Sequence, residues 1–134
     1  MLEVFYTATG VSTGDGRSGH AALTDGTLEL DMSLAGQGSG SNPEQLFALG
    51  YAACFHSALK FVAGRAGKTV DGSTVSATVG IGRDGEAFGL EVELVGSVPG
   101  LGEEEVRELL EAAHETCPYS RATHGNIAVK LSVG

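Results

Sequence analysis

The stretch SNPEQLFALGYAACFHSALKFVAGRAG, residues 41–67, decides the fold because it predicts one long helix. Three neighbouring residues mark its start. Asn42 can cap the helix, Pro43 suits the first helical position, and Gln45 can complete a capping box with Asn42. The helix is expected to continue through Glu44 and the apolar residues that follow.

The predicted helix ends near Gly64 or Gly67, because glycine favours helix termination. Its apolar residues spread around almost the whole axis instead of forming one stripe, which is typical of a helix buried on most sides. One small domain cannot easily cover such a helix. We therefore expect a homodimer.

The segments on either side of this helix have the alternating pattern of half-buried β-strands. Asp25 and Gly26 form a hairpin signal between two of them. Residues 103–116 instead predict an amphipathic helix, which Pro118 prevents from continuing. The resulting order indicates an α+β fold with antiparallel sheets packed on helices. The strands are expected at 2–11, at the end of 14–23, as two short strands in 23–34, and at 74–83, 89–98 and 127–133.

Length and charge limit the classes of function. The 134 residues predict a single domain, residues 1–134, that can bury a core without disulfides. The formal net charge of -9, from 17 acidic and 8 basic residues, repels phosphate backbones and anionic lipids, so no nucleic-acid or membrane partner is expected. The start has no basic signal region, and no apolar run reaches about 18 residues. We expect a cytoplasmic protein, whose thiols stay reduced.

Cys54 lies inside the apolar helix and can be either a core residue or a nucleophile. A free thiol is mostly protonated at neutral pH, so a nucleophilic Cys54 needs its negative charge stabilised. The helix dipole cannot do this, because Cys54 lies about 18 Å from Asn42 along the axis. Lys60 and Arg65 lie too far along the same helix. Arg17, in a glycine-rich turn, is the best candidate, and a solvated turn arginine is its alternative interpretation.

Glu44 projects within roughly 80° of Cys54 around the helix, on the face of Phe47 and Tyr51, but lies about 15 Å away along the axis. It cannot touch the thiol from that position. It could hold the Arg17 side chain, or it could come from the matching helix of a second subunit. An acidic residue in a first turn also complements the helix dipole without any further role.

Cys117 closes the second helix and precedes Pro118, which favours extended backbone. The helix dipole disfavours a thiolate there, so Cys117 is a poor attacker. It could condense with a Cys54 sulfenic acid, but the sequence spacing leaves open whether the two thiols meet. A Cys2His2 zinc site is the remaining alternative, without the usual C-x2-C or H-x3-H spacing. It would combine both cysteines with two of His20, His56, His114 and His124.

Two long segments carry a family resemblance: SNPEQLFALGYAACFHSALK, residues 41–60, and HETCPYSRATHGNIAVKL, residues 114–131. They resemble the signature segments of the organic hydroperoxide resistance (Ohr) family within the OsmC/Ohr superfamily. YTATG, GDGRSGHA, VGIGR and FGLEVEL follow the family's order, so the resemblance spans nearly the whole chain. It implies a thiol-dependent peroxidase for organic and lipid hydroperoxides. It also implies an intertwined homodimer in which antiparallel sheets wrap around long central helices.

The resemblance also implies roles for single residues. Cys54 matches the peroxidatic cysteine and Cys117 the resolving cysteine, while Arg17 and Glu44 match the pair that stabilises the thiolate. A Cys54–Cys117 disulfide is then expected as an intermediate. The implied reductant is a dithiol, dihydrolipoamide or a lipoylated protein, and no flavin, haem or metal cofactor is expected.

The chain departs from the family beside the second cysteine. Where the family more usually reads CPYSNATRGN, this chain has Arg121 and His124, which puts in doubt the surface contacts around Cys117 rather than the chemistry. The aromatic residues Phe47, Tyr51 and Tyr119 are expected to line the peroxide pocket. An OsmC-type stress or ligand-binding protein with little peroxidase activity is the alternative function.

Overall fold

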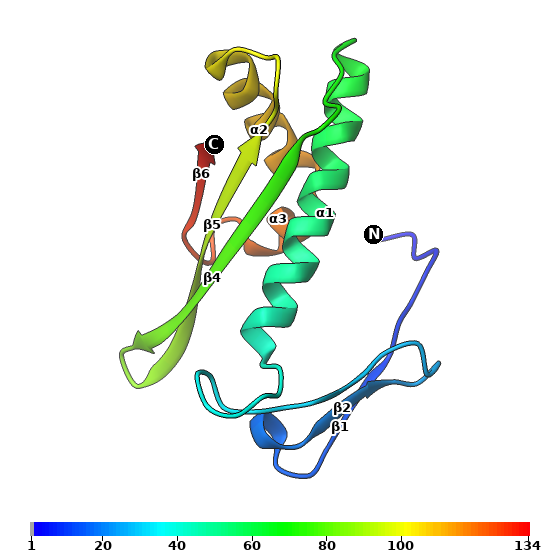
Figure 1. The fold of residues 1–134 in the computed structure, drawn as a ribbon, viewed down its shortest axis with the longest axis vertical. Coiled ribbons are helices and arrows are strands. Elements are labelled where there is room, and N and C mark those ends of the chain that lie inside the picture. Colours follow the sequence, from blue (N-terminus) through cyan, green and yellow to red (C-terminus); the bar gives the residue numbers. More distant parts are fainter. Residues whose placement is uncertain (1) are drawn as a thin grey trace. The chain divides into compact units, whose positions relative to one another are not determined.

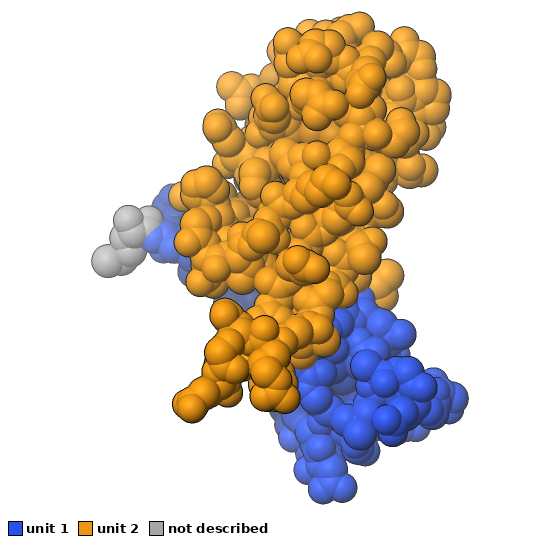
Figure 2. Space-filling model, turned by 90° about the vertical axis from the view of Figure 1, so that its left-hand side faces the viewer, with its two compact units in different colours: residues 1–46 blue, residues 47–134 orange. Residues whose placement is uncertain are grey.

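The computed structural model describes residues 2–134. The chain divides into two compact units, Met1–Leu46 and Phe47–Gly134, which Figure 2 shows in different colours. Their boundary falls in the first turn of helix α1 (Pro43–Arg65). Each unit is therefore described by itself, and the single domain expected over residues 1–134 stays a prediction.

The first unit contains a three-stranded antiparallel sheet in the order β1-β2-β3. The hairpin between β2 and β3 turns at Gly26, whose φ of 78° disfavours any side chain. The Asp25 carboxylate accepts hydrogen bonds from the backbone N–H of Thr27 at 2.9 Å and from its hydroxyl at 2.7 Å. The predicted hairpin is confirmed. The strands are β1 (Gly10–Thr13), β2 (His20–Leu23) and β3 (Glu29–Asp31).

The strand expected over residues 2–11 is shorter than predicted, because β1 begins only at Gly10. Residues 2–9 carry no regular secondary structure. Leu2, Phe5 and Tyr6 are 83%, 100% and 75% exposed. A strand needs a neighbouring strand to accept and donate its backbone hydrogen bonds. No strand among residues 2–134 pairs with residues 2–9. The prediction of a strand from Leu2 is therefore wrong for this chain.

The second unit packs helices against a three-stranded sheet in the order β4-β5-β6. In Figure 1, α2 and α3 lie behind this sheet and α1 runs beside it. Phe55 and Leu59 of α1 are fully buried in the same core as Leu94 of β5 and Leu110 of α2. A Cβ at Gly96 would overlap the Leu110 side chain, so glycine permits this close packing. The elements are β4 (Thr74–Asp84), β5 (Ala87–Ser97), β6 (Val129–Val133), α2 (Glu103–Thr116) and α3 (Pro118–Thr123).

The α+β class is confirmed, with two differences in the second unit. Strand β6 pairs with β5 in parallel, whereas every strand was expected to be antiparallel. The chain leaves β5, passes through α2 and α3, and re-enters the sheet in the same direction, as a helical crossover allows. Helix α3 was not predicted. It begins at Pro118, two residues after Thr116, where α2 was correctly expected to end.

Helix α1 follows its prediction closely, running from Pro43 to Arg65. Its buried residues are Tyr51, Phe55, Ala58, Leu59, Val62 and Ala63. Apolar residues also stand on its exposed side, because Leu49 is 70% and Phe61 54% exposed. By length and composition alone α1 could cross a membrane, but core helices of water-soluble proteins meet the same weak criterion.

Candidate functional site

The two cysteines of the second unit meet. Their Sγ atoms lie 3.4 Å apart, and both thiols are free. Cys54 stands on α1 and is partly exposed, whereas Cys117 is fully buried between α2 and α3. The contact that the sequence spacing left open is therefore present.

Cys117 has the extended backbone that Pro118 predicts, with φ of -63° and ψ of 124°. It closes α2 through a hydrogen bond from its N–H to the carbonyl of Ala113 at 2.8 Å. The same residue caps the start of α3. One extended residue between two helices thus turns the Cys117 side chain toward α1.

Burial raises the pKa of the Cys54 thiol above its ordinary value. A hydrogen bond from the backbone N–H of Tyr119 acts in the opposite direction, and the neighbouring Cys117 raises the pKa further. Burial is the largest influence on this pKa within the second unit. The lowering expected if the Arg17 guanidinium lies against Cys54 stays a prediction.

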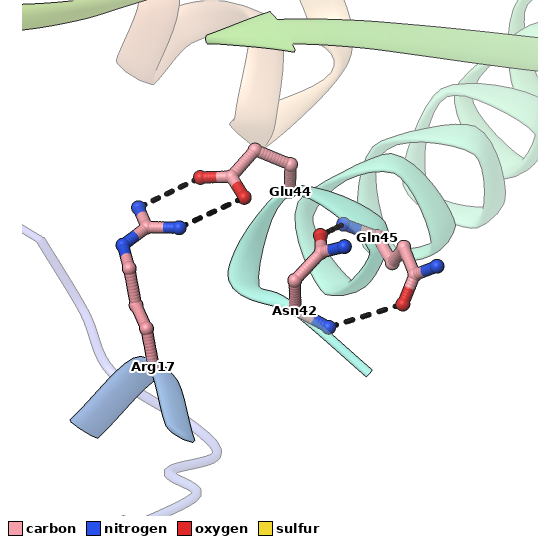
Figure 3. A network of polar contacts seen from close by, with 4 residues as sticks. All are labelled: Arg17, Asn42, Glu44 and Gln45. Carbon is pink, nitrogen blue, oxygen red and sulfur yellow. Dashed lines mark hydrogen bonds and ion pairs between the residues drawn. The ribbon is translucent and has the colours of Figure 1, made fainter. Parts of the chain in front are cut away.

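Arg17 and Glu44 form a two-point ion pair in the first unit (Figure 3). The Arg17 Nη1 donates to Glu44 Oε2 at 3.0 Å, and Nη2 donates to Oε1 at 2.8 Å. The Arg17 side chain is 46% exposed and that of Glu44 only 11%. The hydrogen bonds from Arg17 hold the pKa of Glu44 below its usual value, and those bonds raise the pKa of Arg17. Glu44 therefore holds the Arg17 side chain, as one of the two interpretations of Glu44 expected, and a role of Glu44 across subunits stays a prediction.

Both sides of this pair are fixed by their local sequence. Gln45 N–H donates to Asn42 Oδ1 at 2.9 Å and Asn42 N–H donates to Gln45 Oε1 at 3.0 Å, which confirms the predicted capping box beside Glu44. Arg17 sits in a short 3-10 turn, Gly16–Ser18. A Cβ at Gly19 would overlap the Thr13 carbonyl, so the turn needs glycine after it.

The three expected aromatic residues form one cluster in the second unit. The ring centroids of Phe47 and Tyr51 are 5.9 Å apart, those of Tyr51 and Tyr119 5.8 Å, and those of Phe47 and Tyr119 6.2 Å. Tyr119 is 42% exposed, but Tyr51 is fully buried and lies behind it in the core. Tyr119 packs on Gly50, because a Cβ there would meet its hydroxyl at 3.0 Å.

Sequence reasoning missed a buried polar network next to the thiols. The Tyr51 hydroxyl lies 2.8 Å from Ser120 Oγ and 3.1 Å from Thr123 Oγ1, while His114 Nδ1 lies 2.7 Å from Ser120 Oγ. We call these four residues the Ser120 network. His114, Cys117, Ser120 and Thr123 follow one another at intervals of three residues. This spacing would have indicated the network in the sequence if α3 had been predicted.

A cavity of about 560 Å³ opens beside this network. It contains both residues at which the chain departs from the family pattern, Arg121 and His124. Burial and the nearby His124 lower the pKa of His114, and Glu115 acts in the opposite direction. The lining residues are Glu111, His114, Glu115, Arg121, His124 and Leu131.

Metal-binding side chains do not gather anywhere in residues 2–134. No group of three or more His, Cys, Asp or Glu residues in this range could hold a metal ion. Among these residues, no histidine groups with Cys54 and Cys117 to form the Cys2His2 site that the zinc alternative requires.

Comparisons with known proteins agree with the fold. The OsmC-like protein family model matches residues 36–132. The organic hydroperoxide resistance protein of Xanthomonas axonopodis pv. citri is 45% identical over 137 residues, covering 98% of this chain and 96% of that protein.

Two solved structures have the same fold. The organic hydroperoxide resistance protein OsmC of Legionella pneumophila has a TM-score of 0.91 and 42% identity, covering 98% of this chain and 99% of that one. The OhrB protein of Bacillus subtilis has a TM-score of 0.89 and 42% identity, covering 96% of this chain and 98% of that one.

The α+β fold and the paired thiols on α1 and after α2 define an OsmC-like protein with a two-cysteine site. Within that class, the chain belongs to the organic hydroperoxide resistance (Ohr) family, as its resemblance predicted.

Proposed function

We propose that this protein is a thiol-dependent peroxidase that protects against organic hydroperoxides by reducing them to alcohols. The observation that carries the proposal is the 3.4 Å contact between a partly exposed thiol, Cys54, and a buried one, Cys117. The relatives named as organic hydroperoxide resistance proteins support the substrate class.

The proposed reaction has two chemical steps. The Cys54 thiolate attacks the distal peroxide oxygen, the O–O bond breaks, and the alkoxide leaves and takes up a proton as the alcohol. The Cys54 sulfenic acid then condenses with the Cys117 thiol to a disulfide, releasing water. A dithiol, dihydrolipoamide or a lipoylated protein, reduces the disulfide and becomes a disulfide itself. The protein needs no cofactor for any of these steps.

Arg17 and Glu44 are proposed to stabilise the attacking thiolate. Since burial raises the pKa of Cys54, attack at neutral pH requires a cation to offset that effect. The two-point pairing supports this role, because Glu44 holds the guanidinium in one orientation while part of Arg17 stays exposed.

The apolar part of the substrate is proposed to bind at the aromatic cluster of Phe47, Tyr51 and Tyr119. Tyr119 is the partly exposed ring, and its backbone N–H acts to lower the pKa of the Cys54 thiol. Tyr51 supports this surface from behind, since its ring is fully buried. An apolar surface next to the thiol favours an organic hydroperoxide over hydrogen peroxide.

The working form is proposed to be a cytoplasmic homodimer. Leu49 and Phe61 leave apolar surface on α1, and residues 2–9 expose further apolar side chains. Both are features that a second copy could cover. The net charge of -9 supports the absence of nucleic-acid and membrane partners.

One observation favours the alternative, an OsmC-type stress or ligand-binding protein with little peroxidase activity. The raised pKa of Cys54 lowers its thiolate fraction at neutral pH, which slows attack. Stopped-flow mixing of the reduced protein with cumene hydroperoxide and with hydrogen peroxide distinguishes the two functions. A fast reaction that prefers cumene hydroperoxide is expected. Equally slow oxidation by both would favour the alternative.

A further inference from the structure

The Ser120 network joins three helices in the core of the second unit. Tyr51 belongs to α1, His114 to α2, and both Ser120 and Thr123 to α3. Tyr51 and Ser120 are fully buried and Thr123 is 6% exposed. In this environment each hydroxyl must find a partner, because an unpaired buried polar group is costly.

One direction of donation satisfies all four hydrogen bonds of the network at once. The Thr123 hydroxyl donates to the carbonyl of Ser120 at 3.1 Å, since a carbonyl can only accept. Tyr51 must then donate to Thr123, and Ser120 must donate to Tyr51. Ser120 Oγ is left to accept from His114, which therefore carries its proton on Nδ1.

The four hydrogen bonds of the network join its members to one another and none of them reaches a thiol, so they form no proton relay to the cysteines. The chain of donors ends at a peptide carbonyl, which cannot pass a proton on. Protonation of His114 at Nε2 would also leave its Nδ1–H bond to Ser120 in place. The network therefore acts through the positions of its residues.

Three of its four members stand about one helical turn from a cysteine along the chain. Tyr51 precedes Cys54 by three residues on α1, while His114 and Ser120 lie three residues before and after Cys117. The bonds from Ser120 to Tyr51 and to His114 thus fasten both helices that flank Cys117 to the helix that carries Cys54.

We propose that the Ser120 network positions Cys117 for disulfide formation with Cys54, with Tyr51, His114, Ser120 and Thr123 as positioning residues. The sulfur atoms must approach from 3.4 Å to the bonding distance of about 2.05 Å. Such a short approach needs little rearrangement only while the turn at Cys117 is held in place. The inference rests on the proposed function for its biological meaning, but its geometry can be tested without a peroxide.

The test uses dithiobis(nitrobenzoate), which releases thionitrobenzoate in two steps. The Cys54 thiolate, on the more exposed cysteine, attacks the reagent, forms a mixed disulfide and releases one thionitrobenzoate. The Cys117 thiolate then attacks the Cys54 sulfur, forms the internal disulfide and releases the second. The rate of the first release reports attack by Cys54, and that of the second reports positioning of Cys117.

The informative variants remove one hydroxyl each, outside the aromatic cluster proposed to bind substrate: Ser120→Ala and Thr123→Val. We expect the second release to slow about tenfold, the effect typical of one lost buried hydrogen bond, while the first release stays unchanged. Thr123→Ser keeps the hydroxyl and should restore the second rate. Thr116→Val is the matched control, because its hydroxyl lies next to Cys117 but bonds only to the Ala112 carbonyl of its own helix.

Three results would overturn the inference: an unchanged second release in both Ser120→Ala and Thr123→Val, equal slowing of both releases, or slowing in Thr116→Val as well. Circular dichroism identifies any variant that fails to fold, and the Thr123→Val and Thr123→Ser pair then decides. If the variants behave as expected but wild-type protein does not react with cumene hydroperoxide, the proposed function fails and the positioning role stands.

Discussion

Cys54 and Cys117 approach each other from different helices to an Sγ–Sγ distance of 3.4 Å, and only Cys54 is partly exposed. A reagent from solvent therefore meets Cys54 first. Cys117 is fully buried behind Cys54, so it is placed to react only with the oxidised or modified Cys54 sulfur. This asymmetry supports the proposed roles, attack for Cys54 and resolution for Cys117.

The Arg17–Glu44 pair should control the ionisation of Cys54. In a Cys117→Ser background, Arg17→Ala should move the midpoint of Cys54 alkylation to higher pH, by the one to three units that a close opposite charge typically contributes. Arg17→Lys should retain little of the effect, because lysine lacks the planar fork that pairs with Glu44. Glu44→Ala should have a smaller effect, and the two losses should not add. A midpoint unchanged by Arg17→Ala would identify a solvated turn arginine.

His114 should make the protein less stable in weak acid. Its pKa in the folded chain is lowered from 6.5, so the unfolded chain binds the proton more readily. The stabilising contribution is complete above about pH 6.5 and is lost as the pH falls toward the lowered value. The groups facing His114 are His124 and Arg121 from the segment around α3, and Glu111 and Glu115 from its own helix.

The matched variant for that prediction is His114→Asn, which keeps a side-chain N–H near Nδ1 but does not titrate in this range. Thermal unfolding followed between pH 7 and pH 5 should show a smaller loss of Tm in His114→Asn than in wild type. Parallel Tm profiles would mean that other groups cause the acid sensitivity.

Gly50 should matter for substrate binding more than for stability. In Gly50→Ala the new Cβ would meet the Tyr119 hydroxyl at 3.0 Å and its Cε2 at 3.2 Å, so this partly exposed ring must shift. Alanine favours a helix over glycine by about 1 kcal/mol, which offsets the crowding. We expect an unfolding free energy within about 1 kcal/mol of wild type and a higher KM for cumene hydroperoxide. An unchanged KM would indicate that Tyr119 does not contact the substrate.

The homodimer is tested by light scattering. An apparent mass near twice 13.6 kDa is expected at micromolar concentration. Deletion of residues 2–9, whose apolar side chains are exposed in the single chain, should weaken the dimer. A fully active monomer would contradict this prediction and leave the exposed face of α1 unexplained.

The elements that could be predicted from sequence are those specified by local chemistry. Asn42 and Gln45 fixed the start of α1 because a capping box needs only neighbouring residues. Helix α3 was missed because its six residues are too few for a periodic pattern. The alternation of β6 is compatible with either strand direction, so its parallel pairing to β5 could not be foreseen.

The candidate site likewise combines features that the sequence predicts with features that depend on the folded structure. The residue types of Cys54 and Cys117 indicated thiol chemistry. Their contact depends on how the end of α2 packs against α1, and the sequence spacing does not predict that packing. The sequence identifies a candidate cation for Cys54 more readily than it measures burial, which is the largest influence on the pKa of this thiol within the second unit. Ser120 escaped notice because a serine becomes informative only once its buried partners are known.

The most direct test of the account is a single turnover with one equivalent of cumene hydroperoxide, followed by mass spectrometry. Wild-type protein should yield one equivalent of the alcohol and a Cys54–Cys117 disulfide. Cys54→Ser should consume no peroxide, and Cys117→Ser should react once and accumulate a Cys54 sulfenic acid or its over-oxidised forms. Sustained peroxide consumption by Cys54→Ser, or wild-type cysteines that stay reduced, would contradict the account.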